Sequence, residues 1–136
     1  MVDDGFRLNQ PFVGIATFLR SPMCDNLDTL DTGIAVMGVP TDEGSPFMAG
    51  SRMGPRALRE HSLRFGQGGK GYYDPEHRKQ YLETEMSQKM ITDLGDVDIW
   101  PADIKQTFDN TTEMTRKARD GCDPVSYTHL TLPTKA

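Results

Sequence analysis

The chain has few cysteines and no long apolar segment. Its two cysteines, Cys24 and Cys122, lie far apart and lack the spacing of a metal-binding pair. We therefore expect two reduced thiols, the usual state in a cytosolic protein. No apolar run approaches the ~18–20 residues of a membrane-spanning helix. The first ten residues have neither the basic n-region nor the apolar h-region of a secretory signal. These absences predict a cytoplasmic protein with no membrane partner.

The chain also has no excess of positive charge. Its 15 Lys and Arg residues are outnumbered by 20 Asp and Glu residues, for a net charge of -5 at pH 7. This balance disfavours nucleic acid or an anionic membrane as a partner, whereas it suits a cationic ligand. The three histidines, His61, His77 and His129, are not paired with carboxylates at a metal-ligand spacing.

Residues 34–39 form an unbroken apolar run, IAVMGV. A run without alternation is typical of a strand that is covered on both faces, as in a parallel sheet. Pro40 ends the predicted strand because proline has no N–H for the ladder. Residues 41–53 are rich in glycine and small polar residues, which predicts a loop.

Pro55 stands where the first residue of a helix is expected. Leu58, Ser62 and Phe65 follow at helical spacing and predict its buried face, while Arg56, Arg59, Glu60 and Arg64 take the other sides. Gly66 is placed to end this helix.

A second strand is expected at residues 90–94, closing on Gly95 and Asp96. A helix is expected at 103–119, capped by Asp103 and followed by Gly121. Its core-facing positions would be Ile104, Phe108, Thr111, Thr115 and Ala118. The order strand, helix, strand, helix predicts an α/β protein with a parallel sheet. Between the two halves, residues 72–86 are expected to be a surface excursion with one irregular strand near 81–82.

Four short motifs follow one another along the chain: FLRSP at 18–22, GVPTD at 38–42, GSRMGPRALR at 50–59 and DLGDV at 93–97. Together they resemble the amino-terminal part of the ureohydrolase (arginase/agmatinase) family. The family-motif positions, with a structural or entrance-lining role, are Gly38, Pro40, Asp42, Gly50, Arg52, Gly54, Pro55, Arg59, Asp93, Gly95 and Asp96. We expect Arg52 and Arg59 to brace the loop against the sheet edge, and Asp93 and Asp96 to form turns and hydrogen bonds.

The resemblance implies the incomplete amino-terminal part of a three-layer α/β/α fold. It also implies a parent enzyme with two Mn²⁺ ions that hydrolyses a small cationic guanidino substrate and forms a homo-oligomer, a trimer or hexamer. Agmatine is the generic substrate; guanidinobutyrate and guanidine are alternatives, since residues 65–86 are similar to an insert of guanidino-acid or guanidine hydrolases. The family's ligand motifs GGDH, D-x-H-x-D and D-x-D-x-x-DP do not occur in the chain. We therefore assign no catalytic or metal residue and expect these 136 residues to bind no metal and to be inactive alone.

The last twelve residues, 125–136, resemble the translation of a sequencing-library adapter. The alternative is a genuine short strand at 125–132. The predicted organisation is an arm at 1–31, a partial ureohydrolase domain at 32–124 and a non-native tail. Without a third strand the open sheet edge predicts poor independent folding.

Two other classes of function remain open from the residues alone. One is a small ligand-binding module, because a glycine-rich loop before a helix with Arg56 and Arg59 in its first turns suits an anion. The loop has neither GK[ST] nor a tight G-x-G-x-x-G, which weakens that interpretation. The other is an oligomer-forming module that uses the arm and the aromatic excursion.

Overall fold

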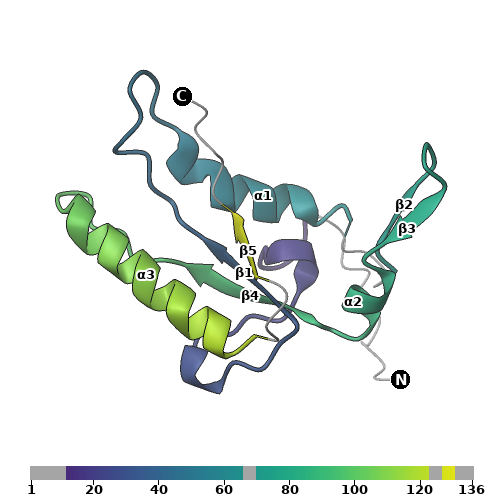
Figure 1. Ribbon diagram of the computed structural model, residues 1–136. Coiled ribbons are helices and arrows are strands. Elements are labelled where there is room, and N and C mark those ends of the chain that lie inside the picture. The colour runs from purple at the N-terminus through teal and green to yellow at the C-terminus, as the bar shows by residue number, and fades with distance from the viewer. Residues whose placement is uncertain (1–11, 66–69, 123–126, 131–136) are drawn as a thin grey trace.

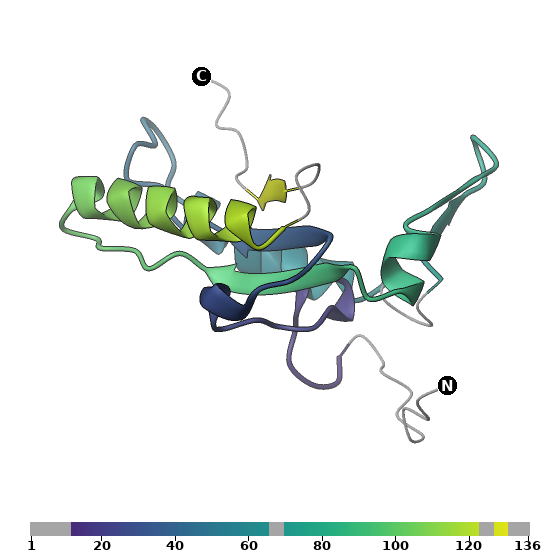
Figure 2. The same ribbon diagram turned by 60° about the horizontal axis from the view of Figure 1, so that its bottom comes forward.

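A parallel sheet lies between two helices in the computed structural model (Figure 1), which describes residues 12–65 and 70–122 and the backbone of 127–130. The strands are β1 (Ile34–Gly38), β4 (Ile91–Asp96) and β5 (Tyr127–Leu130), in the order β4-β1-β5. Helix α1 (Gly54–Ser62) follows β1, and α3 (Ile104–Asp120) follows β4. Figure 2 shows α3 on one side of the sheet and the short 3₁₀ helix at Phe18–Arg20 on the other. Among the described residues, no helix combines the length and apolar character needed to cross a bilayer.

The central strand β1 is buried on both faces. Ala35 and Met37 belong to one apolar cluster with Ala118 of α3, whereas Val36 lies in a second cluster with Leu19 and Ile91. Successive side chains of a strand point to opposite faces, so β1 supplies both layers of the core. The apolar run at 34–39 is unbroken because the side chains on both faces of β1 are buried.

The expectation that no third strand follows α3 is wrong for residues 127–130. This segment forms β5 and pairs in parallel with β1, from Ala35↔Tyr127 to Gly38↔Leu130. The edge of β1 opposite β4 offers unpaired backbone groups, which favour a further strand, and α3 is long enough for a parallel crossover. The adapter origin of residues 125–136 stays a prediction. Poor independent folding also stays a prediction. Its reason is now the outer edge of β5, which has no partner among the described strands.

The described part of the arm packs on the domain. It contains two short 3₁₀ helices, η1 (Phe18–Arg20) and η2 (Leu27–Thr29). Between them the chain runs beside β4, where the Asp93 amide donates to the Pro22 carbonyl at 2.8 Å and the Cys24 amide donates to the Asp93 carbonyl at 2.9 Å. The arm therefore continues the sheet beyond β4 by one isolated bridge. Residues 1–11 of the predicted arm lie outside the described residues.

The excursion is a hairpin rather than one irregular strand. Strands β2 (Tyr72–Asp74) and β3 (Lys79–Tyr81) pair antiparallel, and a short helix α2 (Glu83–Ser87) follows. The Asp74 carboxylate accepts the amides of Glu76 and His77 at 2.9 and 3.3 Å, which closes the turn. The hairpin projects from the body of the molecule (Figures 1 and 2).

The buried face of α1 differs from the prediction. The helix ends at Ser62, and Phe65 beyond it is exposed, with its ring edge-to-face against Tyr72 at 5.4 Å between centroids. Arg59, which was expected off the apolar face of the helix, is buried as well. An arginine can be buried only where its donors find partners, and those partners lie at the end of β4.

The buried face of α3 also differs. Thr107 and Ala118 are its buried residues, whereas Ile104 and Phe108 are exposed. Thr107 is buried because its hydroxyl accepts the Trp100 amide at 3.0 Å and so closes the turn before the helix. Asp103 caps the helix as expected, accepting the Gln106 amide at 2.9 Å.

Gly38 has no room for a side chain. A Cβ at this position would lie 2.0 Å from Asp96 Oδ1 and 2.6 Å from Pro55 Cβ. We therefore expect Gly38→Ala to destabilise the fold by about 1–3 kcal/mol, the range for overpacking a closed site. The control is Gly44→Ala, since a Cβ at position 44 would meet no atom within 4 Å. Equal urea-unfolding midpoints for the two variants would contradict the close approach.

Candidate functional site at the carboxyl end of the sheet

The eleven family-motif residues lie on β1 and β4 towards their carboxyl ends, in the loop at 39–53, or on α1. This end of an open α/β sheet is where ligands usually bind. The charged members form two separate clusters. One joins α1 to the end of β4, and the other closes the loop at 39–53 on itself.

The first cluster is centred on the Arg59 guanidinium. Its Nε and Nη2 donate to the two carboxylate oxygens of Asp93 at 2.8 and 3.0 Å, a bidentate pair. Nη1 donates to Asp96 Oδ1 at 2.7 Å, and Nη2 also donates to the Gly95 carbonyl at 2.7 Å. The Gly95 backbone has a φ of +74°, a left-handed conformation that favours glycine. The geometry therefore fixes helix α1 to the turn that ends β4.

Asp93 is the most connected carboxylate in this cluster. Its side chain is 1% exposed, and it accepts the Gly95 amide at 2.9 Å and the Phe18 amide at 2.8 Å in addition to Arg59. The Leu19 amide donates to Ser62 Oγ at 2.9 Å. Phe18 and Ser62 were not among the predicted site residues. In the sequence, the FLR motif pointed to Phe18. Ser62 could have been found from its position three residues after Arg59 on the same helix.

The charge of Arg59 is stable in this setting. Burial alone lowers the pKa of an arginine, but the hydrogen bonds from Arg59 to Asp93 and Asp96 outweigh it and raise the pKa above its ordinary value. Arg59 is therefore charged throughout the physiological range. It has four hydrogen bonds committed to protein acceptors, so it is not free to bind an anion at the start of α1 as the ligand-module interpretation required.

The second cluster is centred on Asp42, whose side chain is fully buried. Asp42 Oδ1 accepts Arg52 Nε at 2.7 Å, and Oδ2 accepts the Gly50 amide at 2.7 Å. Residues 42 and 50 are thereby held together at the base of the loop. The tip of the loop turns outward, with Phe47 90% exposed.

The described residues do not fit a metal centre. In the described stretches, residues 12–65 and 70–122, no group of three or more His, Cys, Asp or Glu side chains could hold an ion. Asp93, the carboxylate that most suggests a ligand, is occupied by Arg59 and two backbone amides. The side chain of His129 lies outside the description.

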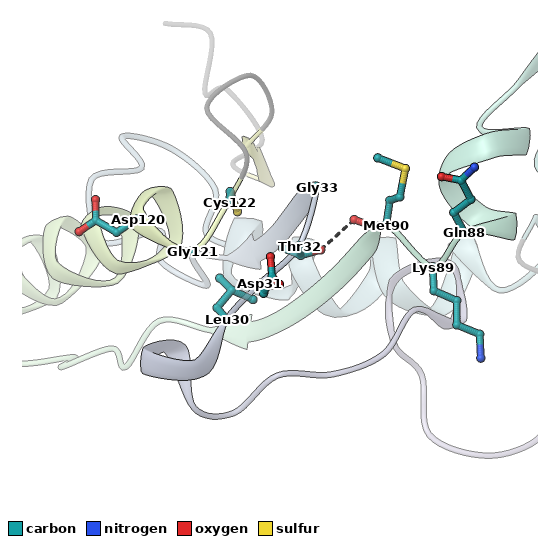
Figure 3. A pocket seen from close by; sticks show the side chains of 10 residues that line it. All are labelled: Leu30, Asp31, Thr32, Gly33, Gln88, Lys89, Met90, Asp120, Gly121 and Cys122. Carbon is teal, nitrogen blue, oxygen red and sulfur yellow. Dashed lines mark hydrogen bonds between the residues drawn. The ribbon is translucent and has the colours of Figure 1, made fainter.

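An open depression lies at the opposite end of the sheet (Figure 3). It is formed where β1 and β4 begin and α3 ends. The Thr32 hydroxyl donates to the Met90 carbonyl at 2.8 Å across its floor. Cys122 also lines it, and burial raises the pKa of that thiol, which makes it a poor nucleophile. None of the family-motif residues lines this depression.

A parallel sheet between helices, with a braced loop at its carboxyl end, defines an α/β protein of the three-layer class. The sequence model of the Arginase family matches residues 32–126, and the chain belongs to this family of hydrolases. It is 36% identical over 125 residues to the putative agmatinase 1 of Schizosaccharomyces pombe, covering 85% of this chain and 28% of that protein. It is 29% identical over 115 residues to the mitochondrial guanidino acid hydrolase of Homo sapiens, covering 84% and 30%.

Solved structures share the fold. Proclavaminate amidino hydrolase from Streptomyces clavuligerus superposes with a TM-score of 0.68 at 21% identity, covering 88% of this chain and 36% of that one. A hypothetical agmatinase from Burkholderia thailandensis gives 0.66 at 20% identity, covering 88% and 34%. The predicted arginase-like fold class is confirmed. The chain spans less than a third of the length of the two curated relatives named above.

Arg59→Ala leaves the Asp93 carboxylate buried without its cation. We expect a loss of about 3–5 kcal/mol in the free energy of unfolding, as for other broken buried pairs. Arg59→Lys should recover only part, because one ammonium cannot replace the bidentate fork. The measurement is urea unfolding of the full-length gene product followed by circular dichroism, and loss of a cooperative transition in the variant counts as the same result.

Arg56→Ala is the matched control for Arg59→Ala. Arg56 lies on the same helix in an exposed pair with Glu60 at 3.2 Å, and its removal should cost no more than about 0.5 kcal/mol. If both variants cost the same, the Arg59 cluster does not organise the fold.

The Asp42 cluster predicts an acid transition of the loop. The Arg52 hydrogen bond, helped by the Gly50 amide, lowers the pKa of Asp42 from 3.8 to about 2. Because the folded pKa is depressed, the stabilisation is complete above about 3.8 and is lost as pH falls through about 2. Titration of the Asp42 carboxyl by NMR checks this. Arg52→Gln should move the midpoint up towards 3.8; an unchanged midpoint would rule out Arg52 as the cause.

Proposed function

We propose that this chain is the amino-terminal part of a binuclear manganese hydrolase that cleaves a small cationic guanidino compound. The observation that carries the proposal is the Arginase-family match over residues 32–126, which contains both charged clusters. In this proposal the 136 residues supply part of the scaffold, the carboxyl ends of β1 and β4. The metal ligands would come from elsewhere in a longer protein, since the described carboxylates do not fit an ion.

The substrate class follows from what the relatives share. Their names include putative agmatinase, guanidino acid hydrolase and the guanidinobutyrase of Pseudomonas aeruginosa, which is 44% identical over 55 residues covering 38% of this chain. Each of the three names refers to an enzyme that acts on a guanidino compound, and these compounds differ in the group at the end opposite the guanidino group. Agmatine, giving putrescine and urea, is our generic choice, with guanidinobutyrate and guanidine as alternatives. The guanidino group is cationic, in agreement with the net charge of -5.

The role we assign to the present residues is support rather than chemistry. Arg59 holds the end of β4, and Asp42 holds both ends of the loop after β1. Rigid backbone at this edge would position whatever residues contact the substrate. The 136-residue chain alone would then be inactive and bind no manganese. The longer protein would be a cytoplasmic homo-oligomer, a trimer or hexamer.

The test begins with the gene, resequenced across codon 124 from an unfragmented template. We expect the frame to continue into GGDH and two aspartate-rich motifs, and the purified product to release urea from agmatine, guanidinobutyrate or guanidine when loaded with Mn²⁺. The 136-residue chain treated identically is the control and should release none. Urea release by the control would contradict the proposal. A longer product that releases no urea from any of the three substrates would contradict it as well.

A further inference from the structure

Helix α3 carries more apolar surface than the sheet covers. Its sheet-facing side holds Thr107 and Ala118, which are 1% and 4% exposed. On the adjoining flank, Ile104 and Phe108 are one turn apart and therefore neighbours on the helix surface, yet they are 47% and 61% exposed. Trp100, in the turn before the helix, is 57% exposed. We call Trp100, Ile104 and Phe108 the α3 flank.

The rest of the helix surface is adapted to water. Lys105 pairs with Asp109 at 2.7 Å and Gln106 with Asn110 at 2.8 Å, while Glu113 pairs with Arg116. These i,i+4 and i,i+3 pairs mark the solvent side of an exposed helix. The α3 flank lies between that polar side and the sheet, where a neighbouring helix of the same layer would pack in a three-layer fold.

A second apolar feature lies at the same end of the molecule. The tip of the loop after β1 carries Phe47 and Met48, 90% and 74% exposed. Both views place this loop and the start of α3 at one end of the molecule (Figures 1 and 2). Large exposed apolar groups on two segments at one end of the molecule indicate a surface that another element covers.

From these observations, and resting on the proposed function, we infer that the α3 flank is the docking surface for the remaining part of the arginase domain. The solved relatives superpose on 88% of this chain, but only 34–36% of their length is used. About two thirds of such a fold thus stands outside these residues and is available to cover the flank. A second copy of this chain is the alternative occupant.

The chain contains a single tryptophan, Trp100, which makes the flank directly observable. The experiment uses the full-length gene product and its single-tryptophan variants, with acrylamide quenching of fluorescence as the readout. In the full-length variant whose only tryptophan is Trp100, this residue should be protected. In a Trp100→Phe background, Phe108→Trp should be protected too. Asp109→Trp in the same background is the matched control, one residue along on the polar side, and should be quenched several-fold more strongly.

The 136-residue chain distinguishes the two occupants. We expect Trp100 to be quenched readily in it at every protein concentration. Protection that appears only as the concentration of this short chain rises would assign the surface to a second copy and overturn the inference. Equal quenching of Phe108→Trp and Asp109→Trp in the full-length protein would overturn it as well, as would a gene that ends at Ala136. Because quenching does not depend on urea release, a protected flank in an inactive protein would contradict the proposed function alone.

Discussion

The bidentate ion pair between Arg59 and Asp93 holds the helix after β1, the end of β4 and the amino-terminal arm in one arrangement. It joins residues 34 positions apart, with Asp93 1% exposed and Arg59 buried. A buried charge is tolerated only when it is paired and hydrogen-bonded. Here each carboxylate oxygen of Asp93 accepts hydrogen bonds from Arg59 and from the amide of Phe18 or Gly95. One residue pair therefore sets the positions of three segments.

The loop after β1 is constrained from both sides by this arrangement. Its end enters α1 beside Gly38, which has no space for a Cβ because Asp96 and Pro55 crowd it. Its base is closed by Asp42 through Arg52 and the Gly50 amide. Neither cluster leaves a carboxylate arranged for a metal among the described residues. This edge is built for rigidity, and a rigid edge is what a catalytic centre assembled from other segments would require.

Sequence patterns predicted the regular elements because their causes are local. The apolar run at 34–39 forms the buried strand β1, and Asp103 caps α3, both as predicted. Each feature depends on residues that are close in sequence. Arg59 was expected off the apolar face of α1 and in a bracing role, but no local pattern could identify its partner, because Asp93 lies 34 residues away.

Other elements could not be predicted because their causes lie outside the local pattern. Ile104 and Phe108 of the α3 flank were assigned to the core, since an apolar spacing cannot tell which neighbour covers it. The hairpin was missed because its turn depends on the Asp74 side chain rather than on apolar alternation.

Amide hydrogen exchange in Arg59→Met, made in the full-length gene product and compared with the unsubstituted protein, tests most sharply whether the ion pair organises this edge. The Phe18 and Gly95 amides donate to Asp93 from segments 75 and 2 residues away. If the ion pair holds them, both amides should lose protection together, while the Gln106 amide at the α3 cap keeps its own. Unchanged protection of the Phe18 and Gly95 amides in the variant would show that the pair does not have this role.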